Sequence, residues 1–274
     1  AVDMDDELAA AQAGAPGGIR QERPCLALLA RDVTGYRNLM QLSSEAYLAT
    51  DGAERPHVPL SFLTRHSEGL IALSGGPGGP VNEALLGQRG DIAEARLEIL
   101  RRAFGDRLYI ELQRHGLDEE KVCEPLLIDL AYRLSLPLVG TNDAFFARED
   151  DFEAHDALLC IAGGALVSED KRRRSTPEHW LKPRADMVAL FADLPEAAAN
   201  SVEIARRCRY WPRPANPMLP RFTSSAEQEA AGKNGAAADP ETEELVRQAH
   251  AGLEARLAAH GAAAGYAVDD YRKR

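Results

Sequence analysis

The sequence predicts an α/β fold in which a partial β/α barrel is followed by a mainly helical segment. Short apolar runs typical of buried strands alternate with longer stretches of helical periodicity. This alternation favours a largely parallel sheet or barrel. After Gly163 and Gly164 only helical patterns follow. Four strands are too few to close a barrel, so we expect part of the barrel to lie upstream of Ala1.

The expected strands are short apolar runs bounded by polar residues, glycine or proline. They cover Cys25–Ala30, Gly69–Ser74, Arg107–Leu112 and Pro137–Gly140. Between and after them, apolar residues recur at helical spacing. These stretches predict helices near residues 34–46, 59–65, 81–86, 91–104, 119–134, 150–161, 183–191 and 195–206.

The C-terminal part of the chain changes in character. A proline-broken stretch ends at Phe222, where we place a domain boundary, and residues 223–239 are rich in Ala, Gly and Ser, as in a linker. Residues 241–260 carry apolar side chains at four-residue spacing and predict an amphipathic helix. Both ends of the chain look cut, because neither a signal peptide nor a closing element is present.

Composition narrows the class of protein. The chain has 274 residues, of which 45% are hydrophobic, and 32 Lys and Arg face 43 Asp and Glu, for a net charge of −11. This balance argues against a surface that is basic throughout, although local patches can still bind phosphate. No apolar run approaches the roughly 20 residues of a membrane helix. The four cysteines lie far apart and are expected to be reduced and buried, which fits a cytoplasmic location.

Candidate site residues cluster after the fourth expected strand. It delivers Thr141, Asn142 and Asp143 to its carboxyl end, where sites of α/β folds are built. The residue best placed to complete a metal pair with Asp143 is Phe145, which cannot ligate a metal. We therefore expect a catalytic scaffold that has lost the reactive groups at this position.

Other candidates have structural alternatives. Glu111 is either a base at a strand end or a buried carboxylate paired with an arginine such as Arg114. His155 is either catalytic or held by a structural hydrogen bond beside Asp156. Residues 75–80 resemble a phosphate loop, but two are prolines without an N–H, which favours a tight turn before a helix.

A basic cluster stands out in this acidic chain. It consists of Lys171, Arg172, Arg173 and Arg174. Trp180, Tyr210 and Trp211 lie among further basic residues downstream, as in surfaces that bind a nucleic-acid backbone or single strand. A solvated face between acidic helices explains the same residues, and the sequence leaves the two interpretations open.

Six segments, taken together, resemble the alpha subunits of bacterial replicative DNA polymerase III, the C-family polymerases. Among them are Gly-Leu-Ile-Ala-Leu-Ser-Gly-Gly and Leu-Pro-Leu-Val-Gly-Thr-Asn-Asp. Their order and spacing make the resemblance specific, and it covers essentially the whole chain. The segments are residues 28–39, 69–76, 104–116, 136–143, 153–161 and 190–197.

The resemblance implies a division of the chain and a set of partners. Residues 1–165 would be the C-terminal portion of a PHP (polymerase and histidinol phosphatase) domain, a distorted β/α barrel. Residues 166–222 would be a helical connection to the polymerase core, 223–240 a linker or loop, and 241–274 the start of the palm-region helices. Magnesium is the expected cofactor of the full-length polymerase, held by carboxylates outside this chain, and none is expected within it. The expected partners are DNA, the proofreading exonuclease subunit and other replicase subunits, with no membrane.

The resemblance also maps metal ligands onto this sequence. Metal-binding members carry His where this chain has Cys25, Cys where it has Gly76, and Asp-x-His where it has Asp143 and Phe145. Losing two or three ligands should abolish tight binding, because each fixes geometry as well as charge. Asp143 is then a vestigial ligand, expected to bond local backbone or an arginine, and the PHP fold a structural and docking domain. The alternatives are a metal-dependent PHP-type phosphoesterase or 3′-5′ exonuclease, and a non-catalytic interaction module.

Overall fold

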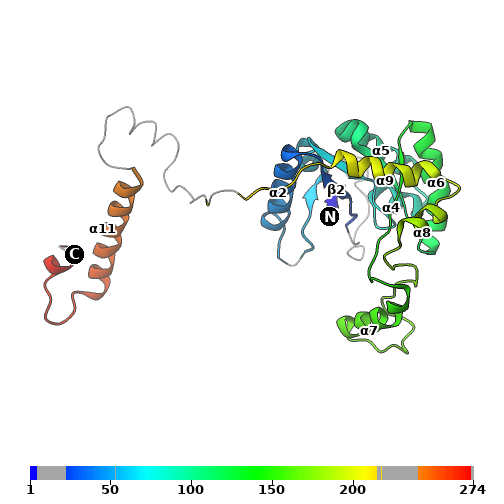
Figure 1. Cartoon of the computed structure of the whole chain (residues 1–274). Helices are drawn as coiled ribbons and strands as arrows, with labels where there is room; N and C mark the ends of the chain where they lie inside the picture. The colour runs from blue at the N-terminus through cyan, green and yellow to red at the C-terminus, as the bar shows by residue number, and fades with distance from the viewer. Residues whose placement is uncertain (5–22, 53, 215–216, 218–239, 273–274) are drawn as a thin grey trace. The chain divides into compact units, whose positions relative to one another are not determined.

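A computed structural model describes residues 1–4, 23–52, 54–214, 217 and 240–272. The chain divides into two compact units, residues 1–212 and 213–274, each of which is considered by itself. Among the described residues, the first unit holds the sheets and most of the helices, and the second holds two helices (Figure 1). The predicted boundary at Phe222 and the predicted linker fall outside the described residues, apart from Pro240.

The main sheet has four strands in the order β2-β4-β5-β6. The strands are β2 (Ala27–Ala30), β4 (Leu70–Leu73), β5 (Leu108–Leu112) and β6 (Leu138–Gly140). β4, β5 and β6 run parallel, as the alternating pattern predicts, whereas the edge strand β2 runs antiparallel to β4. β2 and β6 occupy opposite edges, so within the described residues the sheet is open and no barrel closes.

A second, two-stranded sheet is absent from the sequence-based expectation. β1 (Val2–Asp3) pairs in parallel with β3 (Val58–Pro59). Two-residue strands are too short to give a detectable period, which explains the omission.

The helices of the first unit confirm the expected pattern, with ends that differ by at most two residues. Asp32 caps the first of them, accepting a hydrogen bond of 3.0 Å from the Gly35 N–H. Pro80 and Pro195 each stand at the first helical position, where proline removes no bond. The helices are α2 (Val33–Leu48), α3 (Leu60–Arg65), α4 (Pro80–Leu86), α5 (Gly90–Phe104), α6 (Asp118–Leu134), α7 (Phe152–Gly163), α8 (Arg184–Leu190) and α9 (Pro195–Arg207). Short 3₁₀ turns precede β5 and α7, at Gly105–Arg107 and Glu149–Asp151.

Both faces of the sheet are buried. One face contributes Leu70, Leu108 and Ile110 to the main core, which includes residues of α4, α5 and α6. The other face contributes Ile71, Tyr109 and Val139, which pack with Ile204 of α9 in a smaller cluster. Because both faces are covered, the strands read as continuous apolar runs rather than alternating ones. α9, which belongs to the predicted helical connection, is therefore part of the same compact unit as the sheet.

Phe191 fastens the α8–α9 segment to the sheet. It is fully buried. A Cβ atom built on Gly140 would lie 2.8–2.9 Å from the Phe191 ring, so the ring requires a glycine at the end of β6. Arg114 lies over the same ring at 4.7 Å and donates to the Leu190 carbonyl at 2.6 Å. Arg114 also pairs with Glu124 at 2.6 Å, which ties α6 to this segment.

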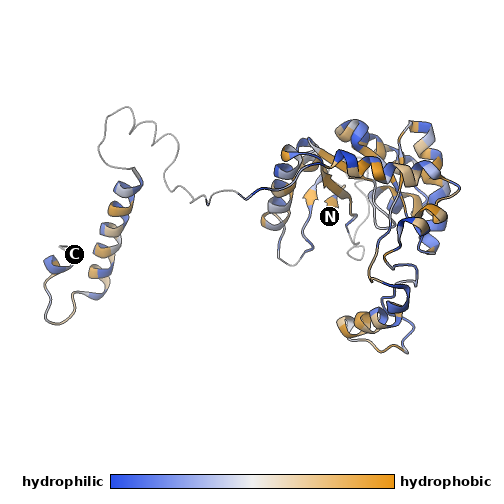
Figure 2. Cartoon of the chain, viewed as in Figure 1, coloured by the Kyte–Doolittle hydropathy of each residue, from blue (hydrophilic) through white to orange (hydrophobic). Residues whose placement is uncertain are grey.

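The second unit contains α11 (Pro240–His260) and α12 (Val268–Arg272). α11 confirms the helix predicted over residues 241–260, and hydrophobic and hydrophilic residues alternate along it (Figure 2). Among the described helices of the chain, none is long and apolar enough to cross a membrane.

The packing of Gly140 against Phe191 gives a stability prediction. Gly140→Ala should lower the free energy of unfolding by about 1–3 kcal/mol, because the new methyl group overlaps the ring of a buried side chain. Urea denaturation followed by circular dichroism measures the change. Gly163→Ala is the matched control: its Cβ would meet nothing within 4 Å inside α7, so it should be neutral or stabilising. Equal effects of the two substitutions would contradict the proposed seat for Phe191.

Candidate functional site at the carboxyl ends of the strands

The loop after β6 places Asp143 at the carboxyl end of the parallel strands, as expected. Its side chain is exposed and makes no hydrogen bond or ion pair with a described residue. The main chain at this position is held instead: the Asp143 N–H donates to His115 Nε2 at 3.2 Å, and its carbonyl accepts from His179 Nδ1 at 2.9 Å. The expectation that the Asp143 carboxylate bonds backbone or an arginine is therefore wrong.

His115 is buried and its orientation is fixed by Glu120 at the start of α6. His115 Nδ1 donates to Glu120 Oε1 at 2.8 Å, and the His115 N–H donates to Glu120 Oε2 at 2.6 Å. Burial alone would raise the pKa of Glu120, but the hydrogen bonds from His115 outweigh it and hold the pKa below its usual value. Because Nδ1 carries the proton in this arrangement, Nε2 is free to accept from Asp143.

A column of stacked rings fills the space beside this loop. His115 stacks on His179 with ring centroids 4.1 Å apart, and His179 stacks on Phe145 at 4.5 Å. Burial lowers the pKa of His179, which favours the neutral ring. His179 is not among the candidate site residues of the sequence, yet only 4% of it is exposed. No local pattern marks it, because a loop distant in sequence carries it to the strand ends.

His155 and Asp156 do not share the expected hydrogen bond. The His155 ring packs near Phe145 and Phe146, with centroids 5.8 and 5.3 Å away, and its buried Nε2 has no partner among the described residues. Asp156 pairs instead with Arg172.

Glu111 is buried at the end of β5 and is hydrogen-bonded to uncharged side chains. It accepts from the Thr141 hydroxyl at 2.6 Å and from the Gln113 amide at 3.3 Å. Burial raises the pKa of Glu111, and these two hydrogen bonds oppose the rise. The predicted pairing with Arg114 is wrong, because Arg114 is engaged with Glu124 and with Asp193 of the α8–α9 connection.

The turn before α4 is a tight turn, as predicted, and it leaves no room for a ligand at position 76. The Gly79 N–H donates to the Gly76 carbonyl at 2.7 Å. A Cβ on Gly76 would lie 2.1 Å from Gln113 Oε1, so the Gln113 amide occupies the place of a side chain there. Cys25 lies beside this turn, its N–H donating to the Gly78 carbonyl at 2.9 Å.

The strand-end residues do not fit a metal cluster. Gly76 and Phe145 offer no ligand atom, the Gln113 amide and the ring column fill the two places, and the His115 imidazole is engaged on both nitrogens. In the part of the chain that the structure describes, no group of three or more His, Cys, Asp and Glu side chains could hold a metal ion.

The basic cluster is divided by its interactions. The Arg172 side chain is only 6% exposed and binds both oxygens of Asp156, at 2.5 and 2.7 Å, fastening the loop to α7. This ion pair lowers the pKa of Asp156. Lys171, Arg173 and Arg174 are exposed, and of these Arg174 donates to the Glu169 carbonyl at 2.9 Å. Three of the four predicted cations therefore face solvent.

Comparison with known proteins agrees with this architecture. Residues 5–115 match the family model of the PHP domain. The chain is 47% identical over 251 residues, 92% of its length, to the DNA polymerase III subunit alpha of Caulobacter vibrioides. The chain belongs to the DNA polymerase III alpha subunit family. The corresponding subunits of Rickettsia bellii and Escherichia coli are 36% and 37% identical over 84% and 85% of the chain. The chain spans only about a fifth of each of these relatives, 21%, 19% and 19% respectively.

The residues at the mapped ligand positions lead to a prediction about the metal content of the chain. After dialysis, the purified chain should hold far less than one zinc or manganese ion per molecule by mass spectrometry, because two mapped positions offer no donor atom. Phosphoesterase activity should be at background, and Asp143→Ala should leave it there. Stoichiometric metal together with activity that Asp143→Ala removes would contradict this prediction.

Proposed function

We propose that the chain is a segment of a template-directed replicative DNA polymerase. The observation that carries this is the 47% identity over 92% of the chain to a DNA polymerase III alpha subunit. Nucleotidyl transfer by such an enzyme uses magnesium ions held by carboxylates. We place these carboxylates in parts of the polymerase outside this segment, and we expect the segment alone to be inactive and to hold no cofactor.

Within the polymerase, the PHP part is proposed to act as a structural and docking domain with a degenerate metal site. Stacked rings and a hydrogen-bond network of Glu111, Gln113 and Thr141 occupy the strand ends, and both stiffen the loops there. The proposed partners of this domain are the palm of the same polymerase, the proofreading exonuclease subunit and other replicase subunits. A cytoplasmic location follows from this function.

A chimera tests the polymerase assignment. The aligned segment of the Caulobacter vibrioides subunit is replaced by this chain, and primer extension by the purified chimera is measured. We expect a rate within roughly tenfold of the parent, because cores tolerate many simultaneous substitutions when volume and patterning are kept. The same chimera with Gly140→Val, which should unseat Phe191, is the impaired control. A folded chimera without extension activity would refute the assignment.

The exposed cations of the basic cluster are proposed to bind the phosphate backbone of DNA. Lys171 and Arg173 have no acidic partner among the described residues, and Arg174 binds only a carbonyl of its own loop. Arg172 supports them by anchoring the loop through Asp156. Phosphate interactions of this kind position a protein on DNA without reading its sequence.

Charge reversal tests the DNA interaction. In fluorescence anisotropy with labelled primed DNA at low salt, the Lys171→Glu, Arg173→Glu double variant should weaken binding by roughly tenfold or more. The slope of log K against log salt should fall by about one for each phosphate interaction that is removed. The Arg37→Glu, Arg65→Glu double variant, an equal charge change at exposed positions of α2 and α3, should have little effect. Equal binding by the double variant and the unmodified chain would show that this face is merely solvated.

The alternative function, a PHP-type phosphoesterase or exonuclease, draws on one observation. Glu111 and Asp143 are close enough at the strand ends for the charge of Asp143 to raise the pKa of Glu111, as carboxylates of a metal site do. The Gln113 amide beside Gly76 and the stacked Phe145 ring weigh against it.

A further inference from the structure

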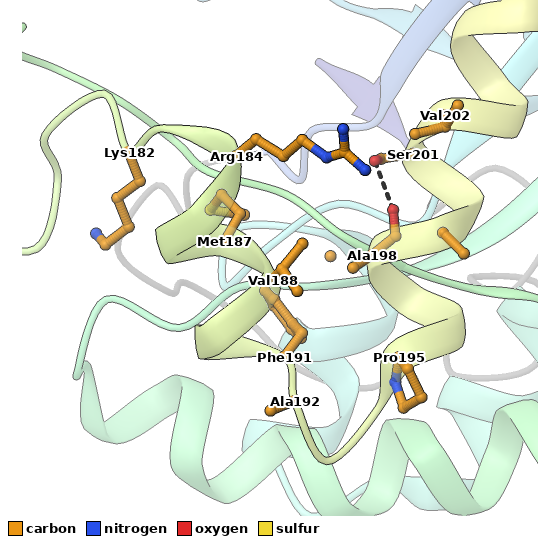
Figure 3. Close-up of a pocket in the computed structure, with 12 residues that line it drawn as sticks. Lys182, Arg184, Met187, Val188, Phe191, Ala192, Pro195, Ala198, Ser201 and Val202 are labelled. Atoms are coloured by element: carbon orange, nitrogen blue, oxygen red, sulfur yellow. Dashed lines mark hydrogen bonds between the residues drawn. The ribbon is translucent and has the colours of Figure 1, made fainter.

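A groove with a volume of about 660 Å³ runs between α8 and α9 (Figure 3). Met187 and Val188 of α8 line one wall, and Ala198 and Val202 of α9 line the other. Gly140 at the end of β6 also lines it, and Phe191 contributes from the α8–α9 connection. The volume lies within the range of about 300–1,000 Å³ typical of ligand sites.

The groove is apolar and nothing in the described unit covers it. Val188 is 51% exposed and Val202 is 47% exposed, although helices in a compact unit normally turn valines inward. Phe191 fixes one wall against the sheet, and Ile204, buried on the opposite face of α9, fixes the other. The groove is therefore formed by two helices that are each fixed by a buried side chain, and it is not a gap between loosely held helices.

The charges at the rim all have one sign. Lys182 and Arg184 line the groove, and no carboxylate is among the described residues that line it. The Lys182 ammonium is engaged by Glu178 Oε2 at 3.2 Å and lies 5.5 Å from the centre of the Trp180 ring. Arg184 is exposed and has no hydrogen bond or ion pair with any described residue. Figure 3 shows its guanidinium extending toward Ser201 on the opposite wall.

These features select the class of occupant. Both walls are helices, and Gly140 of the edge strand β6 lines the groove only where the Phe191 ring packs against it, so the groove offers side chains rather than a free strand edge to an occupant. Ala198 and Ala199 present small side chains that let another backbone approach closely. An unpaired guanidinium above an apolar floor favours a carboxylate carried on an apolar body.

We propose that this groove seats an amphipathic helix of a partner protein, with its apolar stripe between α8 and α9 and a carboxylate on Arg184. The arrangement is the helix-in-groove mode of recognition, with anchors at i, i+3, i+4 and i+7. It goes beyond the polymerase assignment, and the chemistry of the groove does not depend on that assignment.

The test uses the full chain and a designed probe. The probe is a fluorescein-labelled synthetic helix with leucines at i, i+3, i+4 and i+7 and glutamates along one flank, and a second helix carries lysines in place of those glutamates. Anisotropy should show saturable binding of the glutamate helix with a Kd of about 1–100 µM, and weaker binding of the lysine helix. Arg184→Glu should weaken the glutamate helix by at least about fivefold and strengthen the lysine helix.

Two further variants distinguish binding in the groove from non-specific binding to the rest of the chain. Ala199→Trp, at an exposed lining position, should fill the groove and abolish binding of either helix. Arg206→Glu makes the same charge change on α9 outside the lining and should leave both affinities unchanged. Circular dichroism checks that each variant is folded. Absence of binding, indifference to the Arg184 reversal, or full binding by Ala199→Trp would each overturn the proposal.

Discussion

The seat of Phe191 against Gly140 is the interaction on which the arrangement of the C-terminal half of the first unit depends. Burying a phenylalanine stabilises a fold by about 1.5–3 kcal/mol. The ion pair of Arg114 with Asp193 adds little, because the Asp193 side chain is 64% exposed and solvent screens it. Ring burial therefore dominates, and Arg114 chiefly orients the ring and satisfies the Leu190 carbonyl. Without this seat, α8 would have no fixed position, and the groove beside it would lose one wall.

The strand ends are packed at the two positions where the family resemblance would place metal ligands. At Gly76 the missing side chain is replaced by the Gln113 amide, which is itself held by Glu111 and Thr141. At Phe145 the ring joins a stack with His179 and His115. A side chain at position 76 would meet the Gln113 amide, which Glu111 and Thr141 hold, and replacing Phe145 would remove one ring from the stack. Packing therefore fills both positions, which supports the structural or docking role proposed for this face.

The sequence predicted the positions of the helices and strands better than it predicted the directions of the strands and the contacts between residues far apart in the chain. Apolar runs located β4, β5 and β6, and helical spacing located α2 to α9, because both periods reflect burial of the local chain. The antiparallel direction of β2 was missed, since a run of apolar residues is the same read either way. Arg172 was misjudged, and His179 was not singled out, for a related reason: each is buried by residues at least 16 positions away, and no local period records such long-range packing.

The basic residues of this acidic chain differ in what they do. Some hold the fold together, and others remain available to an anionic partner. Arg114, Arg172 and Arg207 are the structural ones: each pairs with a carboxylate and binds a second element of the unit, Arg207 donating to Asp106 and to the Tyr109 hydroxyl. Lys171, Arg173 and Arg184 keep their charge exposed. Because a cation already paired with a carboxylate has little field left for an incoming anion, the number of basic residues overstates the binding surface. The loop after α7 and the rim of the α8–α9 groove are two of the places where exposed cations without a carboxylate partner remain for an anionic partner.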